Sequence, residues 1–418
     1  MYFPTYFSTF PLFPLFHFRC RLTPLDTLHL SRRAALLKPT AVNSILAEIR
    51  QVQSRGRTVI SLMRGEPDFD TPAHIVEAAA AAMNAGRTRY PDNRGEKPLR
   101  QAIAAKLARD NGLSHDADSE ILVTTGATLG IHAALTALLD EGDEVLLPDP
   151  IYDAYQSPIL LCGGRIRPVR STIEHGRFAL RPEAIEAAVT SESRVLLLNT
   201  PWNPVGTVLR EDELRAIGEV VLRHNLVLIS DEIYEAITYE GARHISPAVL
   251  SDDLRARTII INSLSKTYAM TGWRVGYCAA PAPIIDRMFL ALQQSSRGPA
   301  TFVQDAATAA IAGPQDCVVG MRNEYAARRQ LILTTLADVP GVRVLAPEGG
   351  FFAMLDVRQT GVSSNEIRQR LLNDHGVAVV HGAAYGPAGE GTLRVSFGSG
   401  GDTLARGLAQ LRDGLRAL

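Results

Sequence analysis

The stretch RTIIINSLSKTYAMTGWRVGY, residues 257–277, joins an apolar run to a cluster of polar side chains. The apolar run indicates a buried strand, because β-branched residues dominate it. Ser263, Ser265, Lys266 and Arg274 then follow within twelve residues. Two hydroxyls and a guanidinium beside one amine suit a phosphorylated aldehyde, since they bind the phosphate while the amine bonds to the aldehyde. Taken alone, such a segment is more commonly explained by a surface lysine with Ser and Arg nearby.

Outward from this segment, strand-like runs alternate with helical patterns. Near-continuous runs of Val, Ile and Leu are typical of strands buried on both faces of a largely parallel sheet. The pattern predicts an α/β fold, with a large domain over residues 65–299 whose mostly parallel sheet is sandwiched by helices. The further strand candidates are residues 121–125, 143–148, 194–200 and 226–230, and the helix candidates include 74–86, 97–112, 128–139 and 211–225.

The flanking segments 31–64 and 300–418 are expected to form a smaller α+β domain. The first contains Ile45, Ile49 and Val52 at helical spacing. The second contains a long helical stretch and then strand candidates at 351–357, 377–382 and 392–397. Residues 1–30 differ, since the first twenty include six Phe, two Tyr and three Pro. We expect a poorly ordered extension there, with a targeting peptide as the alternative.

Composition excludes several classes of function. The formal net charge is -1, so no bulk field attracts nucleic acid or an anionic membrane. The four cysteines lie far apart without a CxxC motif, which predicts no metal site, no disulfide framework and a cytoplasmic location. A lysine nucleophile has few candidates, because the chain contains only Lys38, Lys97, Lys106 and Lys266.

Two more polar segments follow predicted strands, where open α/β sheets bind ligands. In TTGATLG (124–130) a helix begins near Thr128, so the backbone N–H groups of Gly126, Ala127 and Thr128 would face an anion. An ordinary strand–helix turn is the alternative. In LISDEIYE (228–235) Asp231 ends a strand, where a buried carboxylate requires a cation or a donor. A helix N-cap is the alternative there.

SLSKTYAMTGWRVGY resembles the cofactor-lysine signature of class I/II aminotransferases, the fold-type-I pyridoxal-phosphate enzymes, and in particular their aspartate-aminotransferase branch. The similarity runs in order from Ser31 to the end of the chain. The other segments that carry it are MRGEPDFDTP (63–72), RTRYPDNRG (87–95), TTGATLG (124–130), DPIYDAY (149–155), NTPWNPVGTV (199–208), SDEIYE (230–235), PEGGFFAMLD (347–356) and TLRVSFG (392–398).

The resemblance implies pyridoxal 5'-phosphate as the cofactor, carried by Lys266 as a Schiff base. The same lysine, once released, would act as general base and acid. Asp231 would face the pyridine nitrogen and keep it protonated. Asn203 and Tyr234 would hydrogen-bond the phenolic oxygen of the ring, and Tyr152 would stack on its face.

The resemblance also implies a phosphate site and a substrate site. Arg394 would bind the substrate α-carboxylate with two hydrogen bonds, and Gly65 would contact the same carboxylate through its backbone. Asn203 would also lie beside the substrate, and Tyr90 would reach the phosphate bound to a neighbouring subunit. The expected phosphate ligands within one chain are Gly126, Ala127, Thr128, Ser263, Ser265 and Arg274.

The implied activity is amino transfer from an L-amino acid to a 2-oxo acid, in ping-pong half-reactions within a homodimer with shared active sites. A C–S lyase of the same fold is the alternative, because it needs the same lysine. A non-catalytic aminotransferase-like effector domain is a distant alternative, since residues 1–30 supply no helix-turn-helix. The motifs do not identify the substrate. Arg297, on a turn near the substrate entrance, would pair with a distal carboxylate; a solvated surface arginine is the other interpretation.

Overall fold

A computed structural model describes residues 31–418; the expectations for residues 1–30 lie outside this part. Its largest sheet has seven strands in the order β2-β10-β9-β8-β7-β3-β4. All neighbouring pairs are parallel except those of β10, which runs antiparallel to both β2 and β9. The strands are β2 (Ile121–Thr124), β3 (Glu144–Asp149), β4 (Arg165–Arg170), β7 (Ser193–Asn199), β8 (Val227–Asp231), β9 (Thr258–Ser263) and β10 (Gly276–Ala279).

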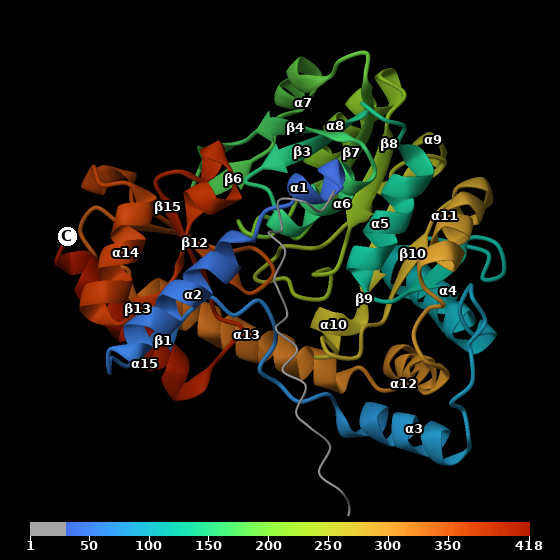
Figure 1. Ribbon diagram of the computed structural model, residues 1–418, viewed down its shortest axis with the longest axis horizontal. Coiled ribbons are helices and arrows are strands. Elements are labelled where there is room, and N and C mark those ends of the chain that lie inside the picture. The colour runs from blue at the N-terminus through green and yellow to red at the C-terminus, as the bar shows by residue number, and fades with distance from the viewer. Residues whose placement is uncertain (1–30) are drawn as a thin grey trace, which may run out of the picture.

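Helices cover both faces of this sheet, as Figure 1 shows. In β7, Val195 and Leu197 pack with α5 and α11, whereas Leu196 and Leu198 pack with α7 and α8 on the opposite face. Successive side chains of a strand point to opposite faces, so an uninterrupted apolar run suits a sheet covered on both sides. The helices are α3 (Ala73–Asn84), α4 (Lys97–Asn111), α5 (Ala127–Leu138), α6 (Gln156–Leu161), α7 (Pro182–Ala188), α8 (Glu211–Arg223), α9 (Asp252–Arg255), α10 (Leu264–Thr267), α11 (Ala282–Ser295) and α12 (Thr301–Ala312).

A smaller, strand-rich part combines the beginning and the end of the described chain (Figure 1). Its four-stranded antiparallel sheet has the order β11-β12-β15-β14, and β1 pairs in parallel with β13. The α/β fold class is therefore confirmed, while the domain boundaries remain predictions. The elements are α2 (Ala41–Ser54), β1 (Ile60–Ser61), α13 (Asp316–Thr335), β11 (Arg343–Leu345), β12 (Phe352–Asp356), α14 (Ser364–His375), β13 (Val377–Ala378), β14 (Val380–His381), β15 (Thr392–Ser396) and α15 (Gly401–Arg416), with α1 (Arg32–Ala35), β5 (Thr172–Glu174) and β6 (Arg177–Ala179) elsewhere.

Local sequence explains where α14 begins and ends. Ser363 caps its first turn, with its side chain accepting a hydrogen bond from the Glu366 N–H. Gly376 ends the helix at φ +65°, and a Cβ at this position would lie 2.7 Å from the Thr58 carbonyl oxygen. Glycine therefore allows the chain to leave the helix close to the segment before β1.

The site is positioned by the carboxyl ends of four adjacent strands. β3, β7, β8 and β9 end in Asp149, Asn199, Asp231 and Ser263, so four polar residues meet at one edge of the sheet. Ligands of open α/β sheets bind at this edge. Within residues 31–418 no helix combines the length and apolar character needed to cross a bilayer.

Candidate active site

A cavity of about 370 Å³ lies at this edge, between the large sheet and β12 and β15. Its walls contain every residue that the sequence predicted for the site except Gly126, Tyr90 and Arg297. The predicted residues that line it are Gly65, Ala127, Thr128, Tyr152, Asn203, Asp231, Tyr234, Ser263, Ser265, Lys266, Arg274 and Arg394.

One end of the cavity is suited to a phosphate. α5 begins after Gly126, whose φ is +79°, and a Cβ there would lie 2.6 Å from Nη2 of Arg274. The absence of a side chain therefore lets the guanidinium approach the helix N-terminus. Ser263 Oγ lies 2.8 Å from Ser265 Oγ on the neighbouring turn. Free N–H groups, hydroxyls and a guanidinium together form an anion site.

Lys266 lies on α10, directly after β9, and its amine reaches into the cavity. Its Nζ donates a hydrogen bond to the Gly65 carbonyl oxygen at 2.7 Å. Burial lowers the pKa of Lys266 to about 8, although the charge of Glu66 acts in the opposite direction. A fraction of the amine is therefore neutral near neutral pH, as a nucleophile or base requires.

Asp231 is buried at the end of β8 and is not a helix N-cap, since no helix follows β8 directly. Its Oδ2 accepts a hydrogen bond from the Tyr155 hydroxyl at 2.6 Å, and Oδ1 accepts one from the Ile233 N–H at 3.2 Å. Burial raises the pKa of Asp231 to about 6, while the Tyr155 bond opposes this shift. A cation near Asp231 would favour its ionised form and lower its pKa.

Arg394 lies on β15 and is 3% exposed. Its neighbours Leu393 and Val395 pack into the hydrophobic core, which confirms that Arg394 points the other way. Its guanidinium lies 4.4 Å from the centre of the Phe352 ring, and Nη2 donates to the Met63 carbonyl oxygen at 3.0 Å. Its Nε is buried without a hydrogen-bond partner among residues 31–418. An anion in the cavity would satisfy this donor.

The comparisons with known proteins agree with this geometry. Residues 57–410 match the family described as Aminotransferase class I and II. The chain belongs to this family. It is a pyridoxal-phosphate-dependent aminotransferase of the aspartate-aminotransferase branch, and these relatives do not favour the C–S lyase alternative.

Two relatives and two solved structures illustrate the similarity. The aspartate aminotransferase of Geobacillus stearothermophilus is 38% identical over 380 residues, covering 90% of this chain and 96% of that protein. The arginine–pyruvate transaminase AruH of Pseudomonas aeruginosa is 40% identical over 359 residues, covering 86% and 89%. The aspartate aminotransferase of Rhizobium meliloti has TM-score 0.89 at 34% identity, covering 93% and 99%. The aromatic aminotransferase of Pyrococcus horikoshii OT3 has TM-score 0.83 at 38% identity, covering 88% and 99%.

The residues of this aminotransferase fit its cofactor. The anion site matches a phosphate, and Asp231 and Lys266 provide a carboxylate and an amine in the same cavity. Asn203 Oδ1 is buried without a partner among the described residues. The Asn203 N–H donates to Asn199 Oδ1 at 2.7 Å, so the backbone of this turn is held by the end of β7. When bound, pyridoxal phosphate withdraws electrons from the substrate α-carbon.

Tyr90 and Arg297 lie away from the cavity of their own chain. Tyr90 is 84% exposed. The Arg297 guanidinium lies 5.2 Å from the centre of the Tyr90 ring, a cation–π distance. Neither residue lines the cavity within one chain. The predicted roles of both residues therefore depend on a second subunit.

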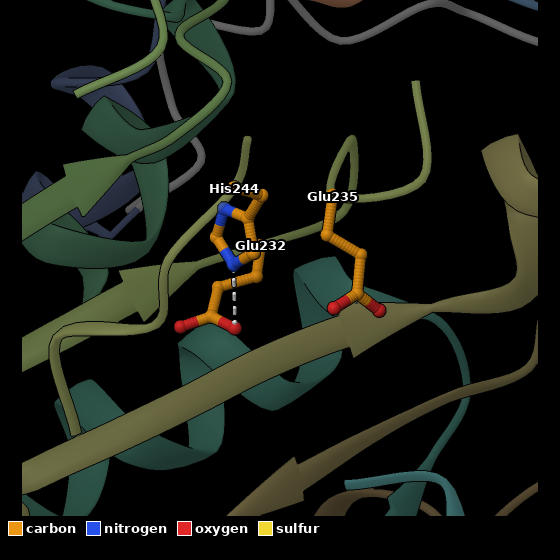
Figure 2. Close-up of side chains that lie close together, drawn as sticks. All are labelled: Glu232, Glu235 and His244. Carbon is orange, nitrogen blue, oxygen red and sulfur yellow. Dashed lines mark hydrogen bonds and ion pairs between the residues drawn. The ribbon is translucent and has the colours of Figure 1, made fainter. Parts of the chain in front are cut away.

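Behind the site, the aminotransferase contains a second polar cluster of Glu232, Glu235 and His244, shown in Figure 2. Glu232 accepts hydrogen bonds from the Ser246 hydroxyl at 2.6 Å and from the Ser230 hydroxyl at 2.9 Å, and its Oε2 lies 3.1 Å from His244 Nε2.

Glu235 pairs with Lys106 and accepts hydrogen bonds from the side-chain amides of Asn262 at 2.7 Å and Asn111 at 2.9 Å. Lys106 and these hydrogen-bond donors therefore satisfy the carboxylates of Glu232 and Glu235. The cluster therefore fixes the segment that carries Asp231 and Tyr234.

The cavity residues that were not predicted as functional include Asp153, Tyr155 and Tyr385. Tyr155 is the hydrogen-bond partner of Asp231, and the Tyr385 ring lies 5.1 Å from the Arg394 guanidinium. Asp153 and Tyr155 both belong to the segment DPIYDAY, which carries the family resemblance. That segment was the available signal for these two residues; Tyr385 lies outside every segment that carried the resemblance.

Proposed function

We propose that the aminotransferase holds pyridoxal phosphate in the 370 Å³ cavity, with Lys266 bonded to the aldehyde. The N–H groups at the start of α5, with Ser263, Ser265 and Arg274, would hold the phosphate. The close contact of Arg274 with Gly126 supports this role, because it brings a cation to the helix N-terminus.

Asp231 would face the ring nitrogen as a carboxylate. The hydrogen bonds from Tyr155 and Ile233 hold both of its oxygens in place. With a pKa of about 6, the group is mainly ionised at neutral pH, and a nearby positive charge would lower this pKa further. Tyr234 and Asn203 would donate hydrogen bonds to the phenolic oxygen, and Tyr152 would cover the ring.

Arg394 would bind the substrate α-carboxylate, together with the backbone of Gly65. The buried, unpartnered Nε of Arg394 supports this role. Lys266 donates to the carbonyl oxygen of Gly65, so the amine and the carboxylate site share one short segment. Lys266 would then remove a proton from the substrate α-carbon as a base and, as an acid, deliver it to the carbon that had formed the aldehyde of the cofactor.

The active assembly would be a homodimer in the cytoplasm, in which Tyr90 reaches the phosphate site of the other subunit. The exposure of Tyr90, away from its own cavity, supports this arrangement. Arg297 contacts Tyr90 and would accompany it to that site. The free Cys162, Cys278 and Cys317 suit a reducing compartment.

The unpartnered Nε of the Arg394 guanidinium, in the same cavity as Lys266, is the observation that most directly supports amino transfer from an α-amino acid. A half-reaction with a good amino donor and no acceptor should release one equivalent of 2-oxo acid per site and then stop. Assays for 2-oxo acid, ammonia and sulfide test this outcome. Continued release of ammonia or sulfide would instead indicate a lyase. A scan of donors against pyruvate, 2-oxoglutarate and oxaloacetate would identify the substrates.

A further inference from the structure

Asp153 lines both the candidate active-site cavity and a neighbouring groove. It follows Tyr152 directly, at the start of the short 3-10 turn Asp153–Tyr155. Its side chain borders the 370 Å³ cavity and also a neighbouring groove of about 1020 Å³. A substrate side chain that extends from the cavity into the groove therefore passes this carboxylate.

The Asp153 carboxylate has an unused acceptor. Its Oδ2 is buried and has no hydrogen-bond partner within residues 31–418. Burial raises the pKa of Asp153, and the charge of Arg394 is the main influence in the other direction. The Asp153 charge also raises the pKa of Tyr152 and of Tyr385, in addition to the effect of their burial. The Asp153 carboxylate is therefore close enough to Arg394 and Tyr385 to influence their end of the cavity, where the substrate α-carboxylate would bind.

Asp153 is a charged residue of the cavity to which the proposed function assigns no role. Arg274 would bind phosphate, Arg394 the α-carboxylate, and Lys266 the aldehyde. Asp231 would face the ring nitrogen. Asp153 is then the one remaining charged side chain in the cavity wall, as far as the described residues show. Asp153 is half-buried, and a donor or a cation would stabilise its buried, unpartnered Oδ2.

The groove has the lining that a long side chain needs. Leu129, Leu160 and Leu161 provide apolar surface for methylene groups. His132 and Lys38 also line it, and Lys38 belongs to the exposed segment 31–39. A dicarboxylic substrate would bring its distal carboxylate close to that of Asp153, and like charges in a partly desolvated site repel each other.

The geometry points to Asp153 as the residue that selects the substrate side chain, so that this aminotransferase favours amino acids with a cationic side chain over dicarboxylic ones. This inference rests on the proposed function. It also opposes the sequence-based role of Arg297, which would favour a distal carboxylate. The two roles predict opposite substrate preferences.

Three amine-free analogues test this selection in the holoenzyme by calorimetry. They are 5-guanidinopentanoate, pentanoate and glutarate. All three share a carboxylate at one end of the molecule, and the other end is cationic, neutral and anionic, respectively. The wild type should bind 5-guanidinopentanoate about 10-fold more tightly than pentanoate, and glutarate most weakly. Tighter binding of glutarate than of pentanoate would overturn the proposal without any variant.

Two variants separate recognition from a structural effect. Asp153→Asn keeps the shape and should bring the preference for 5-guanidinopentanoate over pentanoate close to 1, whereas Asp153→Glu should retain a preference. The ratio of kcat/KM for arginine to that for alanine should fall in parallel for Asp153→Asn. Equal weakening of all three analogues would show that Asp153 only orients Arg394, and would overturn the proposal.

The alanine half-reaction of the wild type separates this inference from the proposed function. No 2-oxo acid from any donor would contradict the proposed function itself. Release of 2-oxo acid without a charge preference among donors would contradict only the role of Asp153.

Discussion

Lys266 and Asp231 share one cavity, and burial shifts their pKa values in opposite directions. The pKa of Lys266 falls to about 8 and that of Asp231 rises to about 6. In both cases the low dielectric disfavours the charged form. The cavity therefore activates the amine, while the hydrogen bonds to Asp231 keep most of its carboxylate ionised near neutral pH.

The lowered pKa of Lys266 predicts how attachment of the cofactor depends on pH. Only the neutral amine attacks an aldehyde, so the rate of covalent attachment to the apoenzyme should rise with pH and level off above pH 8. Stopped-flow absorbance after mixing with pyridoxal phosphate measures this rate. A rate that still increases up to about pH 10, as for an ordinary lysine, would contradict the effect of burial.

At the residue scale, the sequence predicted most of the residues that line the cavity better than the residues that contact them. Lys266 and Arg394 were predicted because their segments resemble the family, and both line the cavity. The partner of Asp231 was missed because Tyr155 lies 76 residues away along the chain and meets it only in the folded sheet. Asp153 was missed for the same reason, since its free oxygen is visible only when the cavity wall is formed.

At the scale of elements, the segment after β8 connects the site to the cluster behind it. Asp231 and Tyr234 line the cavity, whereas Glu232 and Glu235 belong to the hydrogen-bonded cluster. Burial by itself raises the pKa of Glu235, but the charge of Lys106 and its hydrogen bonds produce a net decrease. The paired carboxylates therefore hold the backbone that carries Asp231 and Tyr234.

Breaking this buried pair should destabilise the fold. Lys106→Met leaves Glu235 charged and buried without its cation, so the free energy of unfolding should fall by roughly 3–5 kcal/mol. Urea denaturation measures the change. Lys97→Met is the matched control, because Lys97 pairs with Asp118 on the surface, where the side chains are 58% and 59% exposed. Equal stability of the two variants would contradict the structural role of the cluster.

The elements themselves were mostly predictable, and one exception is instructive. Residues 377–382 read as one strand, but they form β13 and β14 in two different sheets. β13 pairs with β1, whereas β14 pairs with β15. An apolar run indicates burial but not its pairing partner, and both partners are distant in sequence. The strands 194–200 and 226–230 were predicted closely, because they lie inside a sheet covered on both faces.

At the scale of the whole molecule, the chain leaves Tyr90 exposed although the family resemblance assigns it to an active site. The proposed homodimer with shared sites would explain this exposure. The Arg297–Tyr90 contact extends the exposed surface that a partner would cover. In such a dimer, symmetry would give each site Arg394 from one subunit and Tyr90 from the other.

Mixed dimers test this sharing. Chains with Tyr90→Ala and chains with Arg394→Ala should each have low activity alone. After subunit exchange at equal amounts, about one quarter of all sites would contain both intact residues, so activity should recover to about that fraction. Native mass spectrometry confirms that exchange has occurred. Exchange without any recovery of activity would contradict the shared site.

The most direct test of the account is to map where the cofactor is attached. Borohydride reduction of the protein loaded with pyridoxal phosphate fixes the bond, and peptide mapping then identifies the lysine. Only Lys38, Lys97, Lys106 and Lys266 are available, so the answer is unambiguous. We predict that the label is on Lys266 and is lost in Lys266→Ala. A label on Lys38, Lys97 or Lys106 would contradict the site described above.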